Sequence, residues 1–343
     1  MKAVLFHKSG GPEQLTYEEK PDPIAGPGEI TIRVACCALN HLDLWVLQGS
    51  PAYKISFPHV LGADVSGLVE DIGDGVTEFS KGEAVVIDPL VSCGKCEWCG
   101  RGMDNRCVVR SLLGAGPFWG GYSEIVKVPA RNVVKVPRNI SMEEAAAIPV
   151  TFLTSWHMLV SQLNIQNGQT ILVLGAGSGI GTASIAIAKS RGARVIATAS
   201  RKDKQEKALA LGADAVFNHT EPNLSGKVME FTGKRGVDFV VEHIGPASFK
   251  ESLMSLATGG TLVTCGATTG PETPVELRYI FSKELTIKGA YIGTSTEFRD
   301  LIAEFASGRI HATIDSVFPA MEARKALEHL VSRESFGKIL LRH

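Results

Sequence analysis

Short apolar segments alternate with helical segments between about residues 152 and 291, and this alternation constrains the fold more than any other feature. The segment TILVL (170–174), for example, is followed by the small-residue helix SGIGTASIAIAKSRG. Short apolar strands connected by helices form parallel sheets that helices cover on both faces. We therefore predict an α/β fold whose domain at residues 152–291 is a doubly wound parallel sheet of the Rossmann type. The predicted strands lie at 170–174, 194–198, 214–217, 237–241, 261–266 and 285–291.

Residues 1–151 have a different pattern, which predicts a compact β-rich domain with irregular loops. Residues 40–49 have apolar residues at helical spacing and end at a glycine, which predicts a helix. The tail, residues 292–343, returns to helix and strand, and we expect it to rejoin the first domain. The predicted strands of the first domain lie at 29–39, 65–73, 82–89 and 122–129.

The composition argues against several classes of function. The chain carries 35 basic and 36 acidic residues, so we expect no nucleic-acid partner. It has no run of about 18 apolar residues, so we expect no membrane span or membrane partner. The start, MKAVLFHKSGG, is too short and polar for a signal peptide, and we expect a cytoplasmic protein. Cys36, Cys37 and Cys265 lie in apolar runs and are expected to be inert core thiols.

The other four of the seven cysteines are closely spaced. Cys93, Cys96, Cys99 and Cys107 follow the pattern C-x2-C-x2-C-x7-C in a polar stretch. Four thiolates at this spacing surround one tetrahedral zinc ion and leave no open position for water or substrate. The pattern therefore predicts one structural zinc per chain, in a lobe at residues 93–107 and away from the chemistry.

A glycine-rich turn, GAGSGIG (175–181), follows a predicted strand and opens a helix. Missing side chains allow the backbone to approach a pyrophosphate, whose charge faces the N–H groups of the helix. In the register that fits best, Ala176, Ser178 and Gly181 take the three positions of the dinucleotide-binding pattern, so the strict G-x-G-x-x-G is not met. The turn nevertheless predicts a dinucleotide site, with Gly179 and Ile180 among its contacts.

The end of the second predicted strand indicates which cofactor binds. NAD-specific sites place Asp or Glu there for the ribose 2′-hydroxyl. Here the positions hold Ser200, Arg201 and Lys202, and we expect Asp203 to begin the next helix. A hydroxyl and two cations suit a 2′-phosphate, so we predict NADPH, with NADH as the alternative. The competing interpretation is that Arg201 and Lys202 are only the solvated start of a helix.

Together, the lobe SCGKCEWCGRGMDNRC, the glycine turn, the segment GAYIG (289–293) and the domain order resemble the medium-chain dehydrogenase/reductase family, over essentially the whole chain. The resemblance implies a GroES-like catalytic domain before the Rossmann domain, and a homodimer or homotetramer in which residues 285–293 pair across a twofold axis. It also places the segments EHIG and CGATTG beside the nicotinamide. The implied backbone contacts are Gly245, Gly266, Ala267 and Thr268.

Zinc alcohol dehydrogenases of this family hold a catalytic zinc with a Cys, a His-Glu pair and a later Cys. The resemblance places these ligands at Asn40, at Ala63 with Asp64, and near Val150, which do not make a zinc site together. The segment ALNHLDLW (38–45) is instead similar to quinone oxidoreductases and enoyl reductases, which use no catalytic metal. The alternative is an unorthodox metal site built from His41, Asp43, His59 and Asp64.

We therefore expect an enzyme that transfers hydride from NADPH to an activated acceptor. Suitable small molecules are α,β-unsaturated carbonyls, enoyl thioesters such as acryloyl- or crotonyl-coenzyme A, and quinones, because they delocalise the charge that a simple aldehyde would concentrate on one oxygen. Asn40 is the expected donor near the nicotinamide or the substrate oxygen, although it could instead serve only as a helix N-cap. His41 or Tyr53 is the expected proton source, and Asp43 and Asp64 are expected to orient these groups or to be structural.

Two other classes of protein stay open. One is an NAD(P)-dependent zinc alcohol dehydrogenase that uses the unorthodox ligands. The other is a non-enzymatic NADPH-binding protein. Two zinc ions per chain would support the first class, whereas one would support a reductase without a catalytic metal. NADPH binding without turnover would support the second class.

Overall fold

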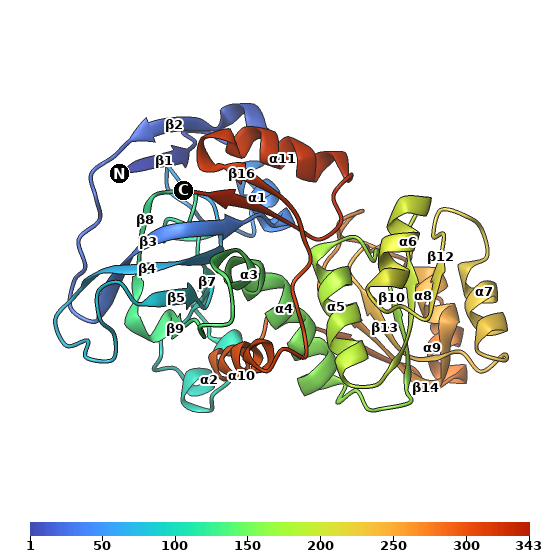
Figure 1. The fold of residues 1–343 in the computed structure, drawn as a ribbon. Coiled ribbons are helices and arrows are strands. Elements are labelled where there is room, and N and C mark those ends of the chain that lie inside the picture. Colours follow the sequence, from blue (N-terminus) through green and yellow to red (C-terminus); the bar gives the residue numbers. More distant parts are fainter. The chain divides into compact units, whose positions relative to one another are not determined.

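The computed structural model describes residues 1–343, which divide into two compact units (Figure 1). Unit 1 comprises Met1–Leu153 and Thr294–His343, and unit 2 comprises Thr154–Gly293. Unit 1 is rich in antiparallel strands, and unit 2 alternates strands with helices. The prediction of an α/β fold with a β-rich domain and a Rossmann-type domain is therefore confirmed.

Unit 2 is built on a six-stranded, entirely parallel sheet with the strand order β12-β11-β10-β13-β14-β15. This is the doubly wound order, in which the chain reverses direction across the sheet beside the first strand. The strand β14 differs most from the prediction. It begins at Leu256 instead of residue 261, across a bulge that contains Gly259 at φ +75°. The strands are β10 (Thr170–Val173), β11 (Arg194–Thr198), β12 (Ala215–Phe217), β13 (Val237–Glu242), β14 (Leu256–Thr264) and β15 (Thr286–Gly289).

Helices cover both faces of this sheet, and α5 and α7 lie on opposite sides of it in Figure 1. Leu172, Ile196, Val240 and Leu253 are buried in one apolar cluster between strands and helices. Burial on both faces explains why the strands read as continuous apolar runs. The helices are α5 (Gly179–Ser190), α6 (Lys202–Ala210), α7 (Leu224–Phe231), α8 (Phe249–Ser255) and α9 (Leu277–Ser282), with a π-helical turn at His157–Gln162. The helix α4 (Pro149–Trp156) begins in unit 1 and ends in unit 2.

Unit 1 is organised around a seven-stranded sheet with the order β16-β17-β3-β4-β5-β9, in which β8 also pairs with β3. The C-terminal strand β17 pairs antiparallel with β3, and Leu340 lies opposite Ala38. This pairing brings the end of the chain next to the start of α1. The strands are β3 (Glu29–Ala38), β4 (Asp64–Ile72), β5 (Ala84–Ile87), β8 (Ile125–Pro129), β9 (Val133–Lys135), β16 (Ile314–Pro319) and β17 (Lys338–Arg342).

The remaining elements of unit 1 are short. Cys36 and Cys37 are buried in its core, as predicted, whereas Cys265 of unit 2 is only half-buried. None of the helices combines the length and the apolar character that a membrane-spanning helix requires. The short strands are β1 (Lys2–Leu5), β2 (Thr16–Glu19), β6 (Leu90–Val91) and β7 (Ser111–Leu112), and the helices are α1 (His41–Leu47), α2 (Glu97–Gly100), α3 (Met142–Ala147), α10 (Ser295–Ala306) and α11 (Ala323–Ser332).

Candidate functional site

Asn40 lies between the end of β3 and the start of α1, in the interior of unit 1. Its backbone N–H donates to Asp43 Oδ2 at 2.8 Å, in the manner of a capping box. Its side chain points elsewhere, because Nδ2 donates to Asp64 Oδ2 at 2.9 Å. The side-chain amide of Asn40 therefore belongs to a buried polar network and does more than cap a helix.

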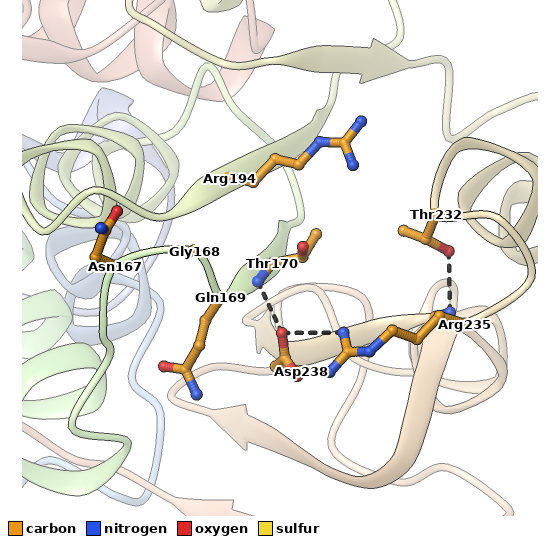
Figure 2. Close-up of a pocket in the computed structure, with 9 residues that line it drawn as sticks. Asn167, Gly168, Gln169, Thr170, Arg194, Thr232, Arg235 and Asp238 are labelled. Carbon is orange, nitrogen blue, oxygen red and sulfur yellow. Dashed lines mark hydrogen bonds and ion pairs between the residues drawn. The ribbon is translucent and has the colours of Figure 1, made fainter.

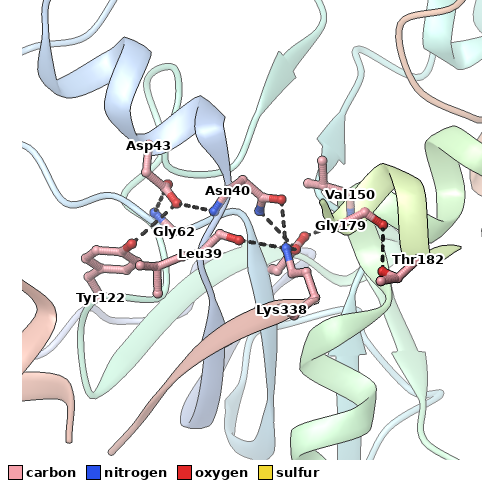
Figure 3. A network of polar contacts seen from close by, with 10 residues as sticks. Leu39, Asn40, Asp43, Gly62, Tyr122, Val150, Gly179, Thr182 and Lys338 are labelled. Atoms are coloured by element: carbon pink, nitrogen blue, oxygen red, sulfur yellow. Dashed lines mark hydrogen bonds and ion pairs between the residues drawn. The ribbon is translucent and has the colours of Figure 1, made fainter. Parts of the chain in front are cut away.

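Lys338, at the start of β17, is the cation of this network, and sequence reasoning missed it. Its ammonium donates to Leu39 O at 2.7 Å and to Asn40 Oδ1 at 2.8 Å (Figure 3). It also donates to Asp64 Oδ2 at 2.8 Å. These three acceptors use all three N–H groups of the ammonium. Lys338 lies 274 residues after Asp64 in the chain, and its only signal in the sequence is a charged residue at the head of the apolar run ILL.

The buried ion pair of Lys338 and Asp64 is well satisfied. The side chains are 3% and 0% exposed, respectively. The second oxygen of Asp64, Oδ1, accepts a hydrogen bond from Val150 N at 2.8 Å. A buried ion pair survives only when further hydrogen bonds satisfy its remaining donors and acceptors, and this pair meets that condition.

Asp43 occupies a second buried position beside this network. Its oxygens accept hydrogen bonds from Asn40 N, from Gly62 N at 3.2 Å and from Tyr122 Oη at 3.3 Å. Burial raises the pKa of the Asp43 carboxyl to about 7 and holds the pKa of Tyr122 well above its usual range. Asp43 thus fixes the turn into α1.

The two histidines of the alternative metal set lie in different surroundings. His59 is buried, its Nε2 lies 3.1 Å from Gly114 O, and burial lowers the pKa of its imidazole. His41 begins α1, is half-buried and lies edge-on to Trp45, with ring centroids 5.7 Å apart. Tyr53 is half-buried in the loop that follows α1. The donor atoms of His41, Asp43, His59 and Asp64 do not converge, since the four cysteines form the one group of three or more such ligands in the structure.

The four cysteines predicted to bind a metal come together in unit 1. All four Sγ atoms lie within 4.8 Å of one another, with 3.9 Å between Cys93 and Cys99 and 3.5 Å between Cys96 and Cys99. A tetrahedral zinc with Zn–S bonds of about 2.3 Å separates its sulfurs by about 3.8 Å, so the residues fit the ion. Backbone N–H groups also point at sulfur, from Cys93 to Cys107 Sγ and from Cys96 to Cys93 Sγ.

In unit 2, the glycine turn connects β10 to α5 as the sequence predicts. Ser178 is the N-cap of α5, and its Oγ accepts a hydrogen bond from Gly181 N at 2.8 Å. A Cβ on Gly181 would come within 2.2 Å of Gly175 O and 2.8 Å of Ala176 Cα, so this position requires glycine. Ala176 is buried, and Gly179 and Ile180 form the first turn of the helix. The close approach of helix to strand leaves a turn that fits a pyrophosphate.

The end of β11 presents three exposed residues, Ser200, Arg201 and Lys202. Arg201 is not free, because its guanidinium contacts both carboxylate oxygens of Asp203, at 2.9 Å (Nε to Oδ1) and 3.1 Å (Nη2 to Oδ2). Asp203 lies in the first turn of α6, as expected, and the pair lowers the pKa of its carboxyl. An anion that approaches Arg201 therefore competes with Asp203.

Glu242, at the end of β13, is a second buried residue that the sequence did not reveal. Its carboxylate accepts from Ile244 N at 2.6 Å and Gly245 N at 3.0 Å, and from the hydroxyls of Ser248 and Ser252 at 2.7 to 3.0 Å. These four donors satisfy a fully buried charge without a basic partner. Glu242 therefore fixes the turn that carries Gly245, whose φ of +94° favours glycine.

His243, which directly follows β13, is buried. Its Nε2 lies 2.8 Å from Leu174 O and 3.3 Å from Ser178 Oγ, so it supports the glycine turn. Burial lowers the pKa of its imidazole. Thr268 Oγ1 lies 3.4 Å from His243 O, which brings the loop with Gly266 and Ala267 to the same edge of the sheet. The predicted cofactor residues thus gather at the carboxyl ends of β10, β11, β13 and β14, where this fold binds ligands.

A cavity of about 560 Å³ lies at the other edge of the same sheet, at the amino ends of β10, β11 and β13 (Figure 2). Its charged groups are already engaged, since Arg235 pairs with Asp238 and Asp238 accepts from Thr170 N at 2.8 Å. Arg194 lies over the ring of Phe231, 4.1 Å from its centroid. The cavity contains none of the residues predicted for the site. Its lining is Asn167, Gly168, Gln169, Thr170, Arg194, Thr232, Arg235, Gly236 and Asp238.

Comparisons with known proteins agree with this arrangement. Residues 26–138 match the family of the alcohol dehydrogenase GroES-like domain, and residues 179–307 match the zinc-binding dehydrogenase family. The chain is 33% identical to an acryloyl-coenzyme A reductase from Metallosphaera sedula, over 99% of each chain. It is 27% identical to a quinone oxidoreductase from Homo sapiens, over 99% of this chain and 97% of the relative. A solved NAD-dependent alcohol dehydrogenase is 41% identical, with a TM-score of 0.97 over 100% of both chains.

Proposed function

The chain belongs to the medium-chain dehydrogenase/reductase family of oxidoreductases, which use a nicotinamide cofactor, and we propose that it reduces activated acceptors with NADPH and without a catalytic metal. The proposed acceptors are α,β-unsaturated carbonyls, enoyl thioesters and quinones. The names of two relatives, a quinone oxidoreductase and an acryloyl-coenzyme A reductase, support these classes.

The observation that carries the proposal is which side chains occupy the positions of the family's catalytic zinc ligands in unit 1. At the positions where the family's zinc alcohol dehydrogenases hold a metal, the chain has the amide of Asn40 and the apolar side chains of Ala63 and Val150. The carboxylate of Asp64 is already neutralised by Lys338. Amide and aliphatic groups are poor zinc ligands, so the substrate carbonyl must be polarised by hydrogen bonds.

Hydrogen-bond donors stabilise a delocalised negative charge more easily than a localised alkoxide. When bound, NADPH would supply the hydride. Asn40 Nδ2 carries two hydrogens and its bond to Asp64 uses one of them, so the second is the proposed donor to the substrate oxygen. His41, next to Asn40 in the chain and half-buried, is the proposed proton source, with Tyr53 as the alternative.

The proposed cofactor, structural zinc, compartment and oligomeric state also go beyond what family membership establishes. The hydroxyl and cations at Ser200, Arg201 and Lys202 support NADPH, and the ion pair of Arg201 with Asp203 supports binding of NADH as well. The convergence of the four cysteines supports one structural zinc. The seven free cysteines suit a reducing cytosol. The exposed edge strand β15 supports a homodimer or a homotetramer.

Product analysis of cinnamaldehyde incubated with NADPH tests the proposal, because this molecule offers both a C=C and a C=O bond. We expect the saturated aldehyde. The allylic alcohol would contradict the proposal and favour an alcohol dehydrogenase, whereas tight NADPH binding without turnover on enals, enoyl thioesters or quinones would favour a non-enzymatic binding protein. Asn40→Ala is expected to lower kcat about 100-fold, while Asn139→Ala, a surface amide bonded to Ala306 O, serves as the matched control.

A further inference from the structure

A side-chain amide has two similar ends, and only its partners decide which end faces a ligand. In Asn40, Oδ1 faces the ammonium of Lys338 and Nδ2 faces the carboxylate of Asp64. An ammonium can only donate and an ionised carboxylate can only accept. The reverse orientation would place an N–H group against an ammonium and an oxygen against a carboxylate, so these two charges determine the orientation of the amide chemically.

We propose that Lys338 is a positioning residue that fixes the amide of Asn40 so that it presents an N–H donor, and never its oxygen, to the substrate. This inference rests on the proposed function, in which Asn40 donates to the oxygen that gains negative charge. An acceptor atom at that place would repel the same oxygen. The donor capacity of the site is therefore set by a residue on β17, at the far end of the chain from Asn40.

The geometry leaves Lys338 little freedom to move. Its ammonium is tied to Leu39 O, Asn40 Oδ1 and Asp64 Oδ2, and its side chain is almost fully buried. Asp64 is tied in turn to the backbone at Val150. The amide of Asn40 is thus held from both ends by groups that are anchored in strands β17 and β4. Such preorganisation matters because a displacement of about 1 Å at a reacting group costs about 100-fold in rate.

A double-mutant cycle on kcat tests the proposal, with turnover measured on whichever acceptor the wild type reduces. Lys338→Met keeps the length of the side chain and removes its charge. We expect a loss of about 100-fold in kcat, equal to that of Asn40→Ala, with the KM for NADPH unchanged within about twofold. The double variant should be no slower than either single variant, because both changes remove the same donor. Fully additive losses would overturn the proposal.

Lys338→Met leaves Asp64 buried without its cation and so risks misfolding. The variant Lys338→Met with Asp64→Asn removes both charges together and keeps the shape of the pair. It is expected to fold and to show the same loss in kcat, and wild-type kcat in this variant would overturn the proposal. Lys283→Met is the matched control, since Lys283 is also partly buried but donates only to the backbone at Met254 and Leu256 in unit 2.

A crystal structure of the variant Lys338→Met with Asp64→Asn supplies a readout that does not depend on activity, because neither charge that orients the amide is left in it. We expect the Asn40 amide to rotate, so that the contact between its Nδ2 and the side chain at position 64 lengthens beyond hydrogen-bond distance. An unchanged amide would overturn the role of Lys338 whatever the enzyme reduces. The product of cinnamaldehyde reduction tests the proposed function separately, because neither the cycle nor the crystal structure depends on which bond is reduced.

Discussion

The carboxylate of Glu242 accepts a hydrogen bond of 2.7 Å from the hydroxyl of Ser252, inside unit 2 and without any basic partner. Glu242 also holds the backbone N–H groups of Ile244 and Gly245, which begin the turn proposed to lie beside the nicotinamide. Charge-assisted hydrogen bonds are about twice as strong as neutral ones, so the buried carboxylate holds each of its N–H and O–H donors firmly in place. The position of Gly245 therefore depends on Glu242.

The first prediction concerns this turn. Glu242→Ala leaves two buried N–H groups and two hydroxyls without their acceptor, at about 1–3 kcal/mol for each unsatisfied group. We expect lower stability in urea unfolding and a Kd for NADPH raised at least about tenfold, measured by fluorescence titration. Ser255→Ala, whose hydroxyl bonds only to Glu251 O, is the control. Unchanged NADPH affinity in a folded Glu242→Ala protein would contradict the role of Glu242.

The second prediction concerns cofactor choice. Asp203 holds the guanidinium of Arg201, so Asp203→Asn should free this cation for a 2′-phosphate. The pair is exposed, and we expect the Kd for NADPH to fall about twofold to fivefold while the Kd for NADH stays the same. Arg201→Ala should weaken NADPH binding alone. Equal changes for both cofactors would show that Arg201 does not face the 2′-position.

The third prediction is a pH dependence of stability that Asp43 causes. Its pKa is about 7 in the folded protein and about 3.9 in an unfolded chain, so between these values the folded protein holds a proton that the unfolded chain has lost. Stability therefore falls as the pH rises from about 4 to about 7, and this contribution is constant above pH 7.

Asp43→Asn removes this contribution. We expect the free energy of unfolding of the variant, measured in urea at several pH values, to decline less between pH 4 and 7 than that of the wild type. Asp74→Asn, a substitution in a surface turn, is the control. Parallel curves for the wild type and Asp43→Asn would show that Asp43 does not titrate in this range.

The fourth prediction separates folding from chemistry at the cysteine lobe. Cys99→Ser should remove the bound zinc, measured as metal content per chain, and lower the melting temperature, because a structural zinc contributes directly to folding. The kcat of the protein that remains folded should stay within about twofold of the wild type. Cys265→Ser, outside the lobe, should keep one zinc. A kcat that falls in proportion to the zinc content would place the metal in the reaction.

The fifth prediction concerns assembly through β15. This strand forms one edge of the sheet in unit 2, and Ile287 and Tyr291 are partly exposed there. An apolar edge strand is a ready surface for pairing with a second copy. Ile287→Asp should halve the mass measured by light scattering, whereas Leu209→Glu, at an exposed leucine of α6, should not. A wild type that is already monomeric would contradict the prediction.

Local patterns in the sequence were enough to predict the strands of unit 2, the glycine turn at 175–181 and the cysteine lobe, because each depends on residues that are close together in the chain. Periodicity reports burial of a single strand or helix, and C-x2-C spacing by itself brings thiolates within reach of one ion. The sequence did not predict the bulge of β14 at Gly259, because periodicity reports only an uninterrupted apolar run. The glycine interrupts this run although the strand continues.

Tertiary structure alone decided the partners of the buried charges. Asn40 and Asp64 were evident as candidates, but the cation between them comes from Lys338, and nothing local in FGKILL indicates which residues it meets. Likewise, hydroxyls and backbone N–H groups of the following turn satisfy the charge of Glu242. No local pattern in the sequence of that turn indicates that these groups meet the carboxylate. A buried charge must find its partners wherever the packed chain places them, so its role depends on contacts that only the completed fold creates.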